Sequence, residues 1–160
     1  MNFIKTLLCA AVLAVVAIPN VNAQFSVRAG VAYGTDISEI GIQGGAMYQF
    51  NDQWRGSADL LFYLVGDGVS AYEINPNVHY IFSDTGTAQF YAIGGLNIIT
   101  VSVDTGIFGN VSASDTGFNL GAGGIFDFGG VQGQAEAKYE LAGGDQLVIS
   151  AGLVFPIGGN

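Results

Sequence analysis

Residues 132–140 read QGQAEAKYE. Every second residue is polar or charged, and only small residues and one tyrosine lie between them. A period of two is typical of a β-strand whose two faces differ chemically. The alternation alone does not say which face meets water. A soluble β-protein turns its charges outward, whereas a membrane barrel encloses them.

The composition of the 160-residue chain favours the second arrangement. Charged residues make up 11% of the sequence, against about 25% in ordinary soluble domains, too few to cover a normal wet surface. Glycine is abundant, with 25 residues. No stretch after the N-terminus approaches the roughly 20 consecutive apolar residues that a membrane-spanning helix needs.

The N-terminus has the layout of a secretory signal peptide. Residues 1–23 carry Lys5 in a short first region, then an apolar run, and end in the small-residue pattern VNA. This order predicts a signal peptide over 1–23, cleaved after Ala23. A retained membrane anchor is the alternative. Cys9 leaves with the signal, so we expect no disulfide framework.

Without that signal the chain is strongly acidic. Arg28, Arg55 and Lys138 stand against thirteen acidic residues, a formal net charge of −10. Nucleic acid needs a basic footprint, so this partner is excluded. Loose Ca²⁺ binding by Asp104 and Asp115 lacks an EF-hand ligand pattern. With no phosphate loop, zinc spacing or nucleophile motif either, we expect no cofactor and no metal.

Alternating segments broken by glycine, aspartate and asparagine turns predict a single domain over residues 24–160. Simple succession of the strands favours an all-β, eight-stranded antiparallel up-and-down barrel. Pro76 suggests a bulge within its strand. Residues 104–115 are expected to form the longest outer loop. The predicted strands are about 25–34, 40–50, 54–65, 70–82, 89–101, 117–128, 131–141 and 146–156.

Aromatic residues on the uncharged face gather at the strand ends and avoid the strand centres. Such a pattern indicates two interfacial girdles around a hydrocarbon band, hence a transmembrane barrel rather than a soluble lipocalin-like one. Ten residues, at ~3.3 Å per residue, separate the two rings along a strand. Because the strands are tilted, the rings lie about 25 Å apart along the barrel axis. The girdle expected at the periplasmic end contains Phe25, Tyr48, Phe50, Trp54, Tyr80, Phe82, Phe90, Phe126, Phe128 and Phe155, and the outer girdle contains Tyr33, Phe62, Tyr72, Phe118 and Tyr139.

The opposite face combines charges with many glycines, which suit a narrow lumen better than a wet sheet surface. An eight-stranded barrel is about wide enough for its own side chains. We therefore expect a paired polar plug; an ion path, preferring cations, is the alternative. The predicted lumen network is Arg28, Arg55, Asp59, Glu73, His79, Asp127, Glu136, Lys138 and Glu140.

Several stretches, including INPNVHYIF (74–82), QFYAIGGLNI (89–98), GFNLGAGGIFDF (117–128), AEAKYEL (135–141) and LVISAGLVFPI (147–157), resemble hairpins of a known family. The chain is similar to the small outer-membrane β-barrels of Gram-negative bacteria, the OmpX/OmpA-domain and opacity-porin-like group. The resemblance implies insertion by the outer-membrane assembly machinery, with Phe155 close to the C-terminal aromatic of such signals. It also implies contact with outer-membrane lipid.

Some barrels resembling this family modify lipid A, and His79 with Ser83 is the candidate pair for such an enzyme. The spacing does not match the closely spaced His-x-Ser of the deacylases, so we expect no enzymatic activity. The leading expectation is a monomeric outer-membrane barrel with a structural or surface-interaction role. A narrow cation-preferring pore comes second and a lipid-modifying enzyme third. The sequence identifies neither a ligand nor a surface partner.

Overall fold

In a computed structural model, residues 24–66, 68–141 and 145–157 are described. The predicted signal peptide, residues 1–23, lies outside them. β1 to β6 are runs of alternating residues, each ending at a turn that contains glycine, aspartate or asparagine. The strands are β1 (Gln24–Gly34), β2 (Glu39–Gln49), β3 (Trp54–Tyr63), β4 (Val69–Asp84), β5 (Ala88–Asp104), β6 (Asn110–Asp127), β7 (Gln132–Leu141) and β8 (Gln146–Ile157).

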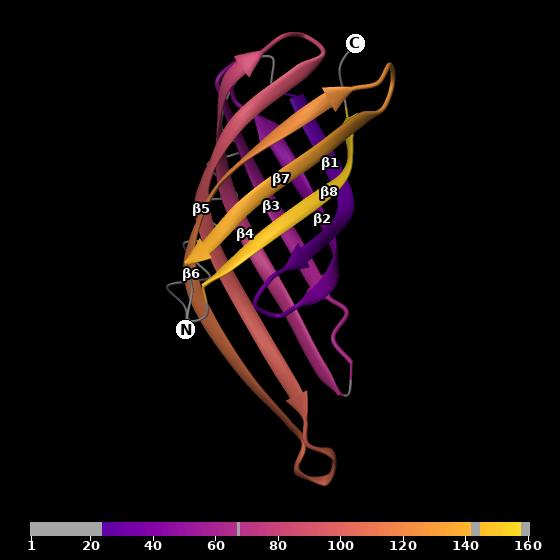
Figure 1. Ribbon diagram of the computed structural model, residues 1–160, viewed down its shortest axis with the longest axis vertical. Helices are drawn as coiled ribbons and strands as arrows, with labels where there is room; N and C mark the ends of the chain where they lie inside the picture. Colours follow the sequence, from indigo (N-terminus) through magenta and orange to yellow (C-terminus); the bar gives the residue numbers. More distant parts are fainter. Residues whose placement is uncertain (1–23, 67, 142–144, 158–160) are drawn as a thin grey trace.

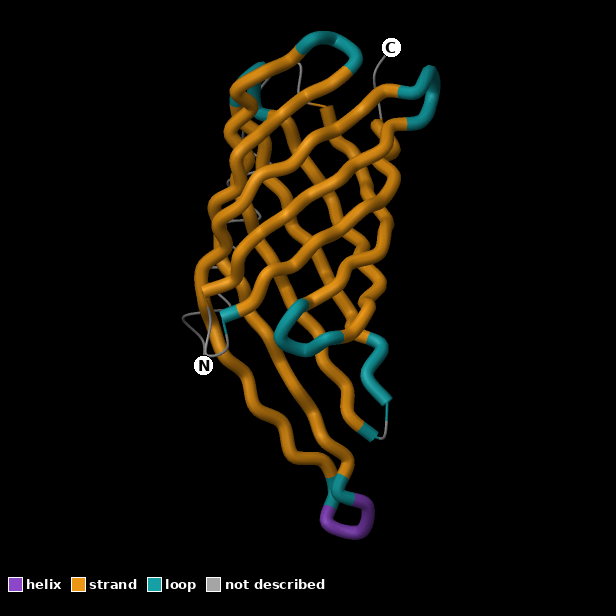
Figure 2. The backbone as a smooth tube through the Cα atoms, in the orientation of Figure 1, coloured by secondary structure: helices purple, strands orange, loops and turns teal. Residues whose placement is uncertain are grey.

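The eight strands form one closed antiparallel barrel in simple sequence order. Each strand pairs with the next, and β8 pairs with β1, where Val27 lies opposite Phe155 and Ala29 opposite Leu153. Figure 1 and Figure 2 show the strands steeply tilted around a single lumen. The predicted up-and-down topology is confirmed. Among the described residues there is no helix whose length and hydropathy would let it cross a bilayer.

Alternation assigns the two faces as predicted. Along β4, Glu73, Asn75, Asn77 and His79 are buried inside the barrel, whereas Ile74 and the other intervening residues point outward. On the outside, large apolar side chains are widely exposed, a feature that soluble monomers rarely show over a continuous surface. This outer surface matches the lipid-facing band of transmembrane barrels.

The predicted girdle aromatics lie near strand ends or in the turns next to them, except Phe118, which is in the middle of β6 because that strand begins at Asn110. Neighbouring strands bring some of them into ring contact, with centroids 5.0 Å apart for Trp54 and Tyr80 and 5.7 Å apart for Phe62 and Tyr72. Phe90 and Phe126 meet edge to face at 5.8 Å. These are the separations at which aromatic pairs attract.

The lumen is layered along the barrel axis. A central polar section is bounded by an apolar layer toward each end, a feature that the sequence did not predict. One layer, toward the end of the barrel where β1 begins and β8 ends, contains Met47, Ile81, Tyr91, Ile93, Ile125 and Val154. The other contains Ala32, Leu61, Tyr63, Ala71 and Val148, with Ile37, Val65 and Val101 packed against it.

Residues 104–115 are not the long loop that the sequence suggested. β5 continues to Asp104 and β6 begins at Asn110, so the segment is a β-hairpin closed by a single 3-10 turn, Gly106–Phe108. Cross-strand pairs such as Val103 with Val111 continue the ladder to its tip. The serine- and glycine-rich sequence concealed a regular alternation of hydroxyl and apolar residues. Figure 1 shows this hairpin projecting well beyond the other strands.

The bulge expected at Pro76 also falls elsewhere. Pairing of β4 with β5 pauses at residues 75 and 76 but resumes in the same register at Asn77 and Gly95. The register shifts instead between Ile81 and Ser83, next to the β4–β5 turn. Proline removes one ladder hydrogen bond without adding a residue, which explains an interruption without a bulge.

Candidate functional site

Arg28 is the centre of the polar lumen. Its Nε donates to Asp59 Oδ1 at 2.5 Å and its Nη1 donates to Glu136 Oε1 at 2.7 Å, while Nη2 pairs with Asp59 Oδ2. The three residues come from β1, β3 and β7, none of which is a neighbour of another in the barrel. One guanidinium therefore ties three walls of the lumen together, in the bidentate geometry that arginine favours.

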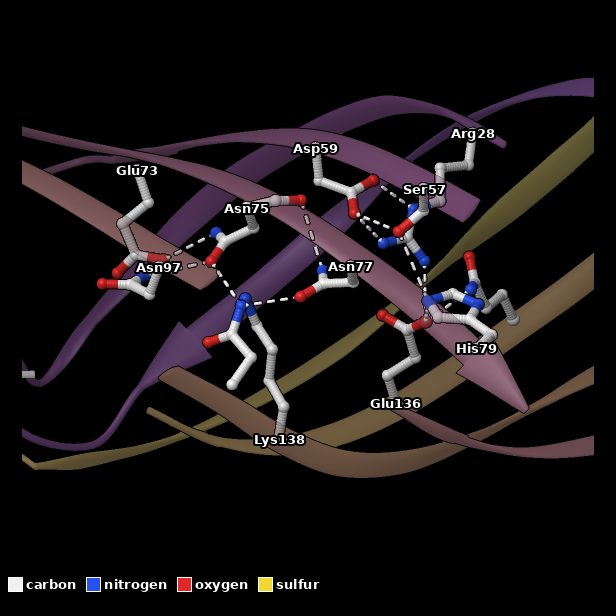
Figure 3. A network of polar contacts seen from close by, with 12 residues as sticks. Arg28, Ser57, Asp59, Glu73, Asn75, Asn77, His79, Asn97, Glu136 and Lys138 are labelled. Carbon is white, nitrogen blue, oxygen red and sulfur yellow. Dashed lines mark hydrogen bonds and ion pairs between the residues drawn. The ribbon is translucent and has the colours of Figure 1, made fainter. Parts of the chain in front are cut away.

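An aromatic and imidazole stack adjoins this ion pair. The rings of His79 and Tyr91 lie 4.6 Å apart and are inclined by 9°. Tyr91 donates its hydroxyl hydrogen to Glu136 Oε1 at 2.8 Å, and Gln134 Nε2 donates to the same Glu136 oxygen at 2.8 Å. Figure 3 shows His79 and Glu136 converging on the Arg28 side chain. Glu136 thus accepts from three groups, which balances its burial.

Four asparagines form the next layer toward the hairpin end, from β4, β5 and β6. Asn97 Nδ2 and Asn119 Nδ2 donate to Asn75 Oδ1 at 3.0 and 2.9 Å. Asn119 Nδ2 also donates to Asn77 Oδ1 at 2.8 Å. Amides can donate and accept at once, so they connect two charged groups without adding charge.

A second charged cluster lies beyond the asparagines. Lys138 Nζ is 2.8 Å from Glu140 Oε1. Glu73 receives hydrogen bonds from neutral donors: Tyr63 at 2.8 Å, Asn75 at 3.0 Å and Gln146 at 3.1 Å. Lys138 therefore pairs with Glu140, while neutral donors from β3, β4 and β8 satisfy Glu73.

The lumen is packed rather than open. Arg28, Gln43, Gln134 and Ser150 border a cavity of about 10 Å³ in the polar section, which is close to the space for one water molecule. Polar groups in such a section rigidify the barrel when they are satisfied. The arrangement supports a plugged barrel, held by cross-lumen ion pairs.

The predicted lumen residues are buried with one exception. Arg28, Arg55, Asp59, Glu73, His79, Glu136, Lys138 and Glu140 all lie inside. Asp127 is exposed at the end of β6. It accepts a hydrogen bond at 2.7 Å from the backbone N–H of Gly129 in the β6–β7 turn, where Gly129 and Gly130 both have positive φ. Asp127 shares the parity of the lumen row, but the strand ends there and its carboxylate caps the turn.

Sequence reasoning overlooked Tyr63 and Tyr91, which supply the lumen's phenolic donors. The available signal was parity, because Tyr91 is in phase with Asn97 on β5 and Tyr63 with Asp59 on β3. The interpretation of aromatic residues as girdle residues obscured the fact that these two tyrosines share the phase of the lumen row. Tyr91 is 0% exposed, so its parity identifies it as a lumen residue.

The buried hydroxyl and imidazole groups do not assemble into a hydrolytic site. Ser57 Oγ, rather than Ser83, lies 3.3 Å from His79 Nε2. Asp59 accepts from Ser57 instead of orienting the imidazole, the reverse of a nucleophile–base–acid relay. His79 is also 0% exposed. Within the described ranges, no group of three or more His, Cys, Asp or Glu residues could hold a metal ion.

No protein-family model and no curated protein matches the chain. Its fold does match solved structures. The N-terminal β-barrel domain of Pseudomonas aeruginosa OprF has a TM-score of 0.71 at 16% identity, covering 84% of this chain and 97% of that domain. Ail, the attachment invasion locus protein of Yersinia pestis, was solved with the heparin analogue sucrose octasulfate. It has a TM-score of 0.61 at 15% identity, covering 84% and 96%.

Neisserial surface protein A is a third such barrel. Its TM-score is 0.60 at 19% identity, with 84% of this chain and 96% of that protein covered. Identities this low establish the fold alone, without transferring a ligand or an activity. The closed eight-stranded topology, the apolar exterior and the polar lumen therefore give this chain the fold of the small outer-membrane β-barrels.

Proposed function

We propose that this protein is an outer-membrane barrel with a plugged lumen, which presents its β5–β6 hairpin at the cell surface to bind an extended segment of another protein. The observation that carries the proposal is an open strand edge. Residues 110–114 of β6 pair with β5 on one side, and no strand within the described ranges pairs with their other side.

This edge is suited to accept a strand. Unpaired backbone N–H and C=O groups form a template for β-augmentation. Natural edges are protected by proline, lysine or inward charges, yet residues 97–119 contain neither proline nor lysine. The two faces of the hairpin also differ, which would select a partner strand with matching alternation.

The lengths of the turns support an orientation in which the hairpin is on the outside of the cell. The hairpin projects from the end opposite Ile157, where β8 finishes (Figure 1). The turns at the Ile157 end are short, comprising residues 50–53, 85–87 and 128–131. Outer-membrane barrels have short periplasmic turns and longer extracellular connections, so the hairpin is assigned to the outside.

Charge argues for a protein segment rather than a sulfated polysaccharide. One structure of Ail is a complex with a heparin analogue. Residues 97–119 of this chain, however, contain two aspartates and no arginine or lysine. An acidic surface repels a polyanion. The backbone edge needs no charge to bind an extended peptide.

Export by the signal peptide of residues 1–23, a barrel domain over 24–160 and insertion by the outer-membrane assembly machinery through the Phe155 strand belong to the same proposal. So does a monomeric state, because the closed sheet leaves no unpaired edge within the band. Chemical crosslinking in outer-membrane fractions tests the last point. A specific dimer band would contradict it.

Conductance measurements distinguish the alternative role, a narrow cation-preferring pore, from the plugged barrel. A lumen filled by apolar layers and ion pairs is expected to give no stable single-channel steps in planar bilayers. Regular steps that favour cations would replace the plugged-barrel proposal with the pore. A lipid-modifying enzyme is tested by lipid A analysis of the His79→Ala variant, for which no change is expected.

The surface-binding proposal is tested with a labelled peptide that copies residues 97–104, the β5 strand that β6 already accepts. We expect it to bind cells that carry the protein. A variant in which an Asn-Gly turn replaces residues 101–113 keeps the barrel and loses the peptide. A control peptide of equal composition without alternation should not bind. Equal binding of both peptides, or retention by the shortened variant, would contradict the proposal.

A further inference from the structure

Arg55, on β3, is the second buried arginine of the lumen and differs from Arg28. It is 4% exposed, yet its Nε and Nη2 have no hydrogen-bond acceptor among the described residues. Its guanidinium carbon lies 4.9 Å from the centroid of the Tyr91 ring. A ring face attracts a cation but does not satisfy the in-plane N–H groups. Among the described residues, Arg55 therefore has neither an ion-pair partner nor an acceptor for these two buried groups.

Arg55 lines a cavity at the barrel end where the β4–β5 and β6–β7 turns lie. The cavity has a volume of about 150 Å³, the size of cavities that hold benzene, a molecule of about six non-hydrogen atoms. Gln49 and Gln132 contribute amide groups to its wall. A polar wall of this kind favours a small polar guest over an apolar one.

Two carboxylates line the same cavity, those of Asp84 and Asp127. Each is held by its turn: the backbone N–H of Gly86 donates to Asp84 at 2.8 Å and that of Gly129 to Asp127 at 2.7 Å. A simple anion would be attracted by Arg55 and repelled by both aspartates. A simple amine would be attracted by the aspartates and repelled by Arg55. Neither ion suits the whole lining.

We propose that this cavity is a binding site for a small zwitterion, a molecule that carries a carboxylate and a protonated amine. The carboxylate pairs with the positive charge of the Arg55 guanidinium at the cavity wall, and the ammonium group lies toward Asp84 and Asp127. Glycine and alanine have the matching size and end groups, and each adds no net charge to the cavity. The site is separate from the hairpin and does not depend on the surface-binding function.

Chemical-shift titration of the ¹⁵N-labelled protein in detergent micelles tests the site, with alanine, acetate and ethylammonium as probes. Alanine should move the amide signals of Gly86 and Gly129, while Gly109 in the hairpin stays unchanged as an internal reference. The dissociation constant for alanine should be at least about tenfold lower than for either single ion. Absence of binding by all three would show that the cavity holds water only and would overturn the proposal.

Two variants test the contacts of the carboxylate and of the ammonium group separately. Arg55→Gln should abolish alanine and acetate binding, with heat-modifiable gel mobility as the check that the barrel is folded. Asp127→Asn leaves the lumen intact and should weaken alanine while strengthening acetate, which makes it informative even if Arg55→Gln fails to fold. Alanine binding that survives Arg55→Gln, or Asp127→Asn that weakens both probes equally, would contradict the assignment.

Discussion

Strands β5 and β6 pass through two regions, the barrel wall and the projecting hairpin, and their two faces exchange character between them. In the wall, Leu96 and Leu120 point outward while Asn97 and Asn119 point into the lumen. In the hairpin, the rows continue without a break in register, but their chemistry is reversed. The outward row carries paired hydroxyls, with Thr100 Oγ1 2.8 Å from Ser114 Oγ and Ser102 Oγ 2.8 Å from Ser112 Oγ, and the lumen-side row carries Val101, Val103, Val111 and Ala113.

The reversal shows that the face pattern follows the surrounding medium and not the strand itself. Lipid lies outside the wall, so apolar residues face outward there and the enclosed side holds the charges. In the proposed orientation the hairpin lies beyond the bilayer, where neither of its sides contacts lipid and the requirement disappears. Exposed Val111, 63% accessible, is then available to a partner.

The largest expected effect comes from removing the central cation of the wall region. Arg28→Ala leaves the buried Asp59 and Glu136 carboxylates without their ion pair, and such a loss costs about 3–5 kcal/mol. Equilibrium unfolding of the refolded barrel in urea measures it. Ser112→Ala in the hairpin should stay within about 0.5 kcal/mol. A loss below about 1 kcal/mol for Arg28→Ala would mean that the network is not essential for stability.

A charge placed on the outward face should cost more stability where that face contacts lipid than where it contacts water. Ala122 lies midway between the girdle residues of β6, so Ala122→Arg is expected to destabilise the barrel by about 2–4 kcal/mol. Ser114→Arg, in the outward row of the hairpin, should change stability by less than about 0.5 kcal/mol. Equal costs at the two positions would place the hairpin in the membrane and remove the distinction between the regions.

Adjacent glycines of β5 compare the two faces of the wall itself. A Cβ on Gly95 would lie 2.7 Å from Asn77 Cα, whereas one on Gly94 meets no atom within 4 Å. Gly95→Ala should therefore cost about 1–3 kcal/mol by overpacking. Gly94→Ala should be neutral or slightly stabilising. Unfolding midpoints of both variants provide the measurement, and the reverse order would contradict the assignment of lumen and lipid faces.

The smallest effect concerns pH at the turn between β4 and β5. The pKa of Asp84 is lowered from 3.8, first by the backbone N–H of Gly86 and then by the Gln89 side chain. A folded pKa below the unfolded one stabilises the turn above the unfolded value and loses that contribution as pH falls through the folded pKa. Amide exchange at Gly86 should accelerate in acid, and Asp84→Asn should remove this pH dependence.

Sequence analysis predicted the topology because period-two alternation and turn residues are local signals. It failed at residues 104–115, where serine, glycine and aspartate are typical of loops, although residues 110–115 pair with β5 and extend the hairpin. It also failed at Asp127, whose parity is that of the lumen but whose position is the end of its strand. Tyr63 and Tyr91 were readable by phase, yet their partners on β4, β7 and β8 were not.

The sequence by itself determined that this is an eight-stranded barrel with an aromatic-ringed exterior and a polar interior, because alternation and girdle spacing are written along each strand. Only the tertiary structure decided which interior side chains contact one another. Arg28 meets Asp59, 31 residues away, and Glu136, 108 residues away, while Arg55 lies beside a cavity and forms no ion pair with any described residue. Those differences depend on strand tilt and register around the closed barrel, which no local pattern encodes.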